Sequence, residues 1–147
     1  MRIEKRLVEG RPLTVIIEYP EWNESVESLV RKIGRMDISF VGKTEEGSVN
    51  IGISDVYYIE NVERKLFIYT EGDVYRFDGS MSDIESRIED TALVRISRTC
   101  IMNTDHLKEI KQIRNSHLEA VMDNDEKLIV SRKYLPDIKK VFRKEGV

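Results

Sequence analysis

From Val49 onward the sequence is a series of short strand-like segments separated by turn residues, and this spacing restricts the fold more than any other feature. The predicted strands are residues 49–53, 56–60, 65–70, 74–77, 93–103, 106–113, 117–122 and 127–130. A short helix capped by Ser80 or Ser82 interrupts them, and a last helix is expected at residues 134–144, with Pro136 tolerated only in its first turn. Short strands at close spacing favour antiparallel sheets built from hairpins. The chain is therefore predicted to be mainly β with short helices (α+β), and a parallel nucleotide-binding sheet is disfavoured.

The N-terminal residues predict a small unit of their own, with the order β-β-α-β. Its predicted elements are strands at residues 2–8 and 13–19, a helix after Asn23 and a strand at residues 36–41. Asn23 is a good N-cap, and Gly34 stands where a helix commonly ends. We therefore expect two units, an N-terminal extension of residues 1–46 that dimerises or regulates the protein, and a main domain of residues 47–147.

The composition restricts the class of protein. The chain has 147 residues, of which 40% are hydrophobic and 35% are charged, so it is expected to be globular and soluble. No apolar run is long enough to cross a bilayer and no signal peptide is recognisable, which predicts a cytoplasmic protein. Cys100 is the only cysteine, and we expect it to be a buried core residue rather than a reactive thiol.

Several kinds of site are not expected. The two histidines, His106 and His117, have no cysteine or histidine neighbour at ligand spacing, so no metal is predicted. There is no set of nucleophile, base and oxyanion donors and no glycine-rich phosphate loop, so neither an enzyme nor a cofactor or small-molecule substrate is expected. The net charge of −3 argues weakly against DNA binding, although the residues after Lys127 are predominantly basic.

The stretch LVRISRTCIMN, residues 93–103, has an unusual composition. Two arginines and two hydroxyl residues lie between Arg95 and Thr99, with apolar residues on both sides. An apolar strand with guanidinium and hydroxyl groups at its exposed end is suited to an anionic partner. DNA is one such partner, but this stretch alone leaves the partner open. Asn103 is expected to cap the turn before Asp105.

Four segments resemble the LytTR DNA-binding domain, the output module of many bacterial response regulators. They are residues 53–60 (ISDVYYIE), residues 69–81 with YTEG and FDGSM, residues 94–103 (VRISRTCIMN) and residues 130–134 (VSRKY). The four follow one another in the order of the family, across about two thirds of the chain. The resemblance implies an elongated stack of small antiparallel sheets that inserts loops into successive major grooves of double-stranded DNA.

The resemblance also implies roles for particular residues. The expected base contacts are Arg64 or Lys65, Arg98 and Arg132. The expected contacts with the DNA backbone are Arg95, Ser97, Thr99 and Lys133. The partners implied are promoter repeats, a second copy of the chain and a membrane protein that restrains the regulator.

The sequence departs from the family pattern in two respects. Ser97 stands where the family often has a histidine, and no receiver domain is recognisable before the module, which predicts a stand-alone regulator. The alternative function is a protein–protein interaction module without DNA binding, in which the strand edges and the N-terminal unit recruit a partner. For the single residues, the alternatives are that Arg98 is an exposed arginine paired with a nearby carboxylate and that Arg132 is a solvated residue in the first turn of a helix.

Overall fold

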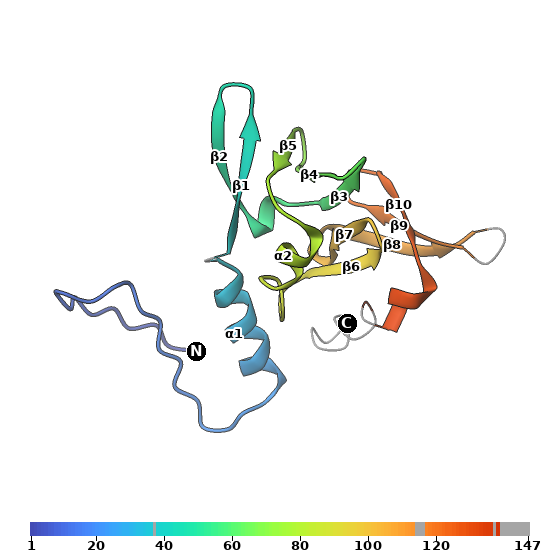
Figure 1. The fold of residues 1–147 in the computed structure, drawn as a ribbon. Helices are drawn as coiled ribbons and strands as arrows, with labels where there is room; N and C mark the ends of the chain where they lie inside the picture. The colour runs from blue at the N-terminus through green and yellow to red at the C-terminus, as the bar shows by residue number, and fades with distance from the viewer. Residues whose placement is uncertain (37, 114–116, 137, 139–147) are drawn as a thin grey trace.

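Two antiparallel sheets form the body of the protein (Figure 1). The computed structural model describes residues 1–36, 38–113, 117–136 and 138. The larger sheet has seven strands in the order β2-β1-β5-β4-β3-β7-β6, and the smaller has the order β10-β9-β8. The strands of the larger sheet are β1 (Ser39–Thr44), β2 (Gly47–Gly52), β3 (Tyr58–Val62), β4 (Lys65–Tyr69), β5 (Val74–Phe77), β6 (Leu93–Ser97) and β7 (Cys100–Asn103). Those of the smaller sheet are β8 (Leu107–Gln112), β9 (Leu118–Met122) and β10 (Lys127–Val130). The prediction of a mainly β protein with antiparallel sheets is confirmed.

Strand β7 lies between two hydrophobic cores. Its successive side chains point to opposite faces of the sheet, as the pleat requires. Ile101 is in the core that α2 (Met81–Glu85) covers, whereas Cys100 and Met102 are in the core shared with the smaller sheet. All four side chains of β7 are therefore buried, and the strand ties the two cores together.

Residues 93–103 form a hairpin and not the single strand that was predicted. Strand β6 ends at Ser97, and β7 begins at Cys100, directly opposite it. The sequence shows no sign of a turn here, because the turn contains no glycine, proline or asparagine. A hydroxyl takes their place, since the Thr99 N–H donates to Ser97 Oγ at 3.3 Å.

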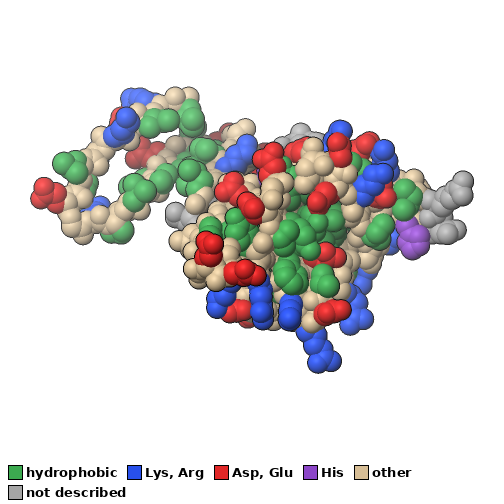
Figure 2. Space-filling model, turned by 90° about the horizontal axis from the view of Figure 1, so that it is seen from above, with side chains coloured by type: hydrophobic (Ala, Val, Ile, Leu, Met, Phe, Trp, Pro, Cys, Tyr) green, Lys and Arg blue, Asp and Glu red, His purple; other side chains and the backbone are tan. Residues whose placement is uncertain are grey.

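The two strands predicted at residues 2–8 and 13–19 are wrong. Residues 1–22 contain no strand, and they form an irregular arm that extends away from the body (Figure 1). Apolar side chains are exposed along the arm (Figure 2). Leu7 and Leu13 are among the exposed large hydrophobic residues. A two-stranded ribbon is marginal in water unless an apolar face packs on something else, and here nothing in the described chain covers that face.

The helix predicted after Asn23 is confirmed as α1 (Glu24–Met36). The Val26 N–H donates to Asn23 Oδ1 at 3.0 Å, which is the expected N-cap bond. The helix continues two residues beyond Gly34, so this glycine does not end it.

The third N-terminal strand begins and ends later than predicted. Strand β1 pairs with β2 along its whole length, and Lys43 of β1 also pairs with Arg76 of β5. The proposed boundary after residue 46 therefore falls in the turn of a hairpin that belongs to the larger sheet. The division into two units stays a prediction.

The end of the described chain is helical. A 3-10 turn at Arg132–Tyr134 leads into helical residues that include Pro136, which occupies the first turn as required. Residues 139–144 of the predicted helix lie outside the described residues. No helix in the described part of the chain is long and apolar enough to cross a membrane.

Candidate nucleic-acid interface

The fold brings together the three segments in which the sequence predicted base contacts. The turn between β6 and β7 lies between the other two. On one side, the Asn61 N–H at the end of β3 donates to Thr99 O at 2.8 Å. On the other side, the Ser131 N–H after β10 donates to Ile96 O at 2.7 Å. Segments that are up to 70 residues apart in the sequence, Asn61 to Ser131, are thus held in one place by backbone hydrogen bonds.

The turn between β3 and β4 presents Arg64 at its tip. Val62 pairs with Lys65, so the turn has only two central residues, Glu63 and Arg64. Both have positive φ, 52° and 68°, as a type I′ turn requires. Neither is a glycine, so this tip is strained. Arg64 and Lys65 are both exposed.

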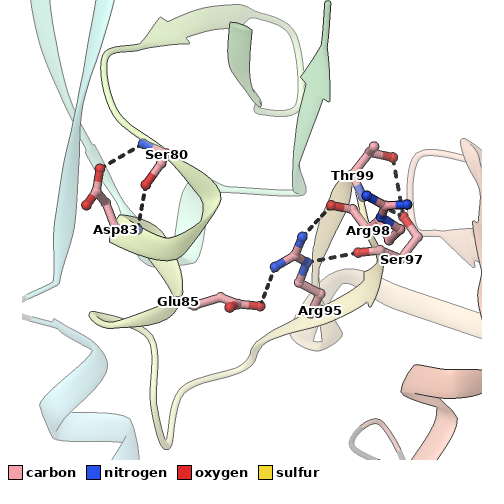
Figure 3. Close-up of polar contacts among 7 residues, drawn as sticks. All are labelled: Ser80, Asp83, Glu85, Arg95, Ser97, Arg98 and Thr99. Carbon is pink, nitrogen blue, oxygen red and sulfur yellow. Dashed lines mark hydrogen bonds and ion pairs between the residues drawn. The ribbon is translucent and has the colours of Figure 1, made fainter. Parts of the chain in front are cut away.

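The turn between β6 and β7 presents Arg98. Arg98 and Thr99 are exposed, and Ser97 is half-buried. No hydrogen bond or ion pair joins the Arg98 guanidinium to any other residue that the structure describes. The hydroxyls of Ser97 and Thr99 lie 3.5 Å apart beside it (Figure 3). This turn therefore presents two hydroxyls and a guanidinium that no described residue of the protein engages.

Arg95 differs from Arg98, because its guanidinium is already engaged (Figure 3). Its Nε donates to Ser97 O at 3.0 Å, and its Nη2 donates to Arg98 O. Its Nη1 donates to Glu85 Oε1 at 2.8 Å. Only 21% of its side chain is exposed.

Helix α2 positions Glu85. The helix begins with a capping box, in which the Asp83 N–H donates to Ser80 Oγ at 3.1 Å and the Ser80 N–H donates to Asp83 Oδ2 at 2.8 Å. Hydrogen bonding from the Ser80 N–H, with a contribution from the Ser80 hydroxyl, holds the pKa of the Asp83 carboxyl below its ordinary value. Of the two predicted caps, the structure has Ser80.

The segment after β10 adds a third basic site. Arg132 and Lys133 are exposed on the 3-10 turn. Lys133 Nζ lies 5.7 Å from the ring centre of Tyr134, within the range of a cation–π contact. Arg132 has a partner of its own within the protein.

Cys100, the first residue of β7, is buried as predicted. Burial, with a contribution from Glu60, raises the pKa of its thiol to about 12. The thiol therefore stays protonated at neutral pH and is a packing residue, not a nucleophile.

Asn103 has a larger role than the cap that was expected. The Asp105 N–H donates to Asn103 Oδ1 at 2.9 Å, which confirms the cap. In addition, Asn103 Nδ2 donates to Ile53 O at 3.2 Å and to Val56 O at 2.8 Å. Asn103 is 1% exposed and thus joins β7 to the segment that precedes β3.

The sequence did not predict the roles of Glu85 and Asn61. Glu85 is ten residues from Arg95, and Asn61 is thirty-eight residues from Thr99. Neither spacing corresponds to a local motif, so only the tertiary structure pairs them.

Two concave surfaces of the described structure lie away from these basic segments. A hollow of about 350 Å³ is lined by residues that include Asp55, Glu71 and His106, and another of about 630 Å³ lies between α1 and the arm. Neither is lined by a predicted DNA contact. Over the residues described, no three histidine, cysteine or acidic side chains are grouped so that they could hold a metal ion.

Comparison with known proteins identifies the domain. The sequence pattern of the LytTr DNA-binding domain matches residues 46–143. The chain is similar to the LytTr DNA-binding domain of a response regulator from Bacillus cereus, whose solved structure superposes with a TM-score of 0.65 at 26% identity, over 71% of this chain and 95% of that one.

Similar full-length proteins carry names of regulators. The sensory transduction protein LytT of Enterococcus faecalis is 30% identical over 133 residues, which are 89% of this chain and 55% of that protein. The LytT protein of Bacillus anthracis is 25% identical over 96% of this chain and 59% of its own length. The transcriptional regulatory protein LytR of Staphylococcus aureus is 32% identical over 49% of this chain and 29% of its own. The chain thus spans little more than half the length of the curated relatives that it matches most fully. Since the family pattern covers two thirds of the sequence and the fold agrees, the chain belongs to the LytTr DNA-binding domain family.

Proposed function

We propose that this protein is a bacterial transcriptional regulator that binds double-stranded DNA sequence-specifically, by inserting turns into the major groove. The observation that supports this most directly is Arg98, an exposed arginine at the tip of a hairpin turn that is braced on both sides, whose guanidinium has no partner among the residues that the structure describes. A guanidinium presented in this way matches the O6 and N7 acceptors of guanine.

The three basic segments take different roles. Arg98, Arg132 and either Arg64 or Lys65 contact base edges in successive grooves. Arg64 is the better candidate of the last two because it stands at the strained tip, whereas Lys65 lies within β4.

The remaining groups hold the DNA backbone. The hydroxyls of Ser97 and Thr99 donate hydrogen bonds to phosphate oxygens, and Lys133 provides a positive charge beside the phosphates. Such contacts fix the register of the protein on the duplex without selecting a sequence.

The assembly we propose is a homodimer on paired promoter repeats in the cytoplasm. The exposed apolar side chains of the arm, such as Leu7, Leu13 and Ile16, support a protein contact there. A membrane protein that restrains the regulator is the further partner that the family resemblance implies.

The test of the DNA site is Arg98→Ala, measured by fluorescence anisotropy on a duplex from the promoter region upstream of the protein's own gene. Loss of a bidentate base contact is expected to weaken specific binding by about 10- to 100-fold, with a smaller effect on a scrambled duplex. Binding should also weaken steeply as the salt concentration rises.

Arg76→Ala is the matched control, because Arg76 is also exposed but lies on β5 beside Asp78. It removes the same charge and should change the affinity for the specific duplex little. If Arg98→Ala binds as tightly as the wild type, the site is elsewhere. If the wild type has no salt-dependent affinity for DNA, the protein–protein interaction module is the better description.

The test of the dimer compares the full chain with residues 23–147 by light scattering. This truncation keeps α1 and β1, and thus leaves the larger sheet complete. We expect a dimer that becomes a monomer when the arm is removed. If both forms have the same number of subunits, the arm does not dimerise the protein.

A further inference from the structure

We propose that Arg95 does not contact DNA but is a positioning residue: held by Glu85 of α2, it fixes the backbone of the turn that carries Arg98. This inference rests on the proposed function of Arg98. It assigns Arg95 a different role from the phosphate contact that the sequence predicted.

Each nitrogen of the Arg95 guanidinium donates to an acceptor within the protein. Nε donates to the carbonyl of Ser97, the last residue of β6, and Nη2 donates to that of Arg98, the first residue of the turn, while Nη1 donates to the Glu85 carboxylate (Figure 3). The carboxylate also neutralises the positive charge. A phosphate would have to compete with a carboxylate at 2.8 Å for a side chain that is only 21% exposed.

The turn needs this support because its backbone is not of the type that closes hairpins well. Two-residue hairpin loops favour turns with positive φ, since these match the twist of the strands. Glu63 and Arg64 satisfy this rule, but Arg98 and Thr99 do not have positive φ. A register shift between Arg95 and Ser97 marks the same irregularity.

Hydrogen bonds to backbone carbonyls hold the turn from both sides. On the β6 side, Arg95 donates to the carbonyls of Ser97 and Arg98, and the Ser131 N–H donates to Ile96 O. On the β7 side, the Asn61 N–H donates to Thr99 O at 2.8 Å. With both sides held, the backbone at Arg98 has little freedom, and its exposed side chain extends from a fixed point. A binding group that is already in place loses less entropy when it binds.

The position of Glu85 is in turn set by the core. Met81 and Ile84 of α2 are buried, and the Ser80 capping box fixes the start of the helix. Leu93 and Arg95 lie on the face of β6 that α2 covers, with Leu93 in the core and Arg95 at its margin. The packing of α2 therefore determines where the Arg98 turn is held.

The decisive test is Glu85→Ala, because the two roles of Arg95 predict opposite signs. If Arg95 positions the turn, loss of Glu85 weakens binding to the specific duplex by about 3- to 10-fold, although the protein becomes more positive. If Arg95 is a phosphate contact restrained by Glu85, the same variant binds more tightly. Glu89→Ala, which removes an exposed acid four residues away, is the matched control and should not weaken binding.

Arg95→Lys and Arg95→Ala give a second comparison. A lysine keeps the charge, but its single nitrogen cannot stand at the three positions from which Nε, Nη1 and Nη2 reach their acceptors. The positioning role predicts that both variants lose the same 3- to 10-fold, that the salt dependence of binding keeps its slope, and that Glu85→Ala adds nothing to Arg95→Ala. A phosphate contact predicts near-normal binding by Arg95→Lys and a slope about one unit smaller for Arg95→Ala. That outcome would overturn the proposal.

Arg98→Ala is measured alongside, so that failure of the proposed function is recognised separately. If neither the wild type nor the variants bind DNA specifically, the backbone dynamics of the free protein decide the inference. Nuclear magnetic resonance relaxation should show the amides of Arg98 and Thr99 becoming more mobile in Arg95→Ala and Glu85→Ala, and unchanged mobility in both would refute it.

Discussion

Asn103 provides the most direct test of how the two cores are joined. The Asn103→Ala variant loses three hydrogen bonds: those from Nδ2 to Ile53 O and Val56 O, and that from the Asp105 N–H to Oδ1. At about 1 kcal/mol each, the sum is about 3 kcal/mol. Asp105 is exposed, so in the variant its N–H can donate to water instead, and that bond costs less than the other two. We therefore expect the free energy of unfolding to fall by about 2–3 kcal/mol.

The measurement is urea unfolding followed by far-ultraviolet circular dichroism. Trp22 fluorescence is less suitable, because Trp22 lies outside both cores and is 52% exposed. Asn50→Ala is the matched control, since Asn50 is exposed on β2 and should change stability by less than about 0.5 kcal/mol. The urea m-value should stay constant in both variants.

Asn103→Asp separates the donors of this side chain from its acceptor. An aspartate can still accept the Asp105 N–H, but it cannot donate to the two carbonyls and would be buried beside them. It should therefore be less stable than Asn103→Ala. A loss below about 1 kcal/mol for Asn103→Ala, or a more stable Asn103→Asp, would refute the reasoning.

Three further predictions concern stability. Ser80→Ala should cost about 1 kcal/mol in urea unfolding because it removes the cap of α2, whereas Ser82→Ala should cost less; equal losses would contradict the capping box. The Cys100 thiol has a pKa of about 12 in the folded chain against an ordinary 9.0, so the stability it contributes is present below about pH 9 and is lost as the pH rises toward 12. The urea midpoint should consequently fall less steeply between about pH 8.5 and pH 10.5 in Cys100→Ala, and an unchanged slope would be evidence against burial of the thiol. Removal of residues 1–22, compared at a protein concentration low enough for both chains to be monomeric, should shift the melting temperature by no more than about 2 °C, because none of these residues is in either core; a fall of more than about 5 °C in calorimetry under that condition would show that the arm packs on the body.

Local patterns in the sequence determined most of the strands, the first helix and the fold class. The turns at Glu71–Asp73 and Asp123–Glu126 contain glycine, asparagine or aspartate, and the strands beside them were predicted close to their observed limits. Asn23 and Asn103 were recognised as caps because a cap acts on residues two or three positions away. Such signals are local, and local chemistry is visible in sequence.

The errors occurred where the outcome depended on distant packing. The arm has alternating apolar residues typical of strands, but strands need a partner surface, and the described structure offers none to residues 1–22. The hairpin at residues 93–103 looked like one strand because apolar residues continue through both halves. Only the pairing of Ser97 with Cys100 shows the bend.

In the candidate site, too, the sequence predicted the local features and the tertiary structure decided the rest. The sequence singled out Arg95 and Arg98 together, as two arginines in one basic stretch, and it could not distinguish their environments. The tertiary structure separates them, since Arg95 lies on the face of β6 that meets Glu85 whereas Arg98 stands at the tip of the turn. Side-chain chemistry is encoded in the sequence, but whether a guanidinium is already occupied depends on acceptors that only folding brings within reach.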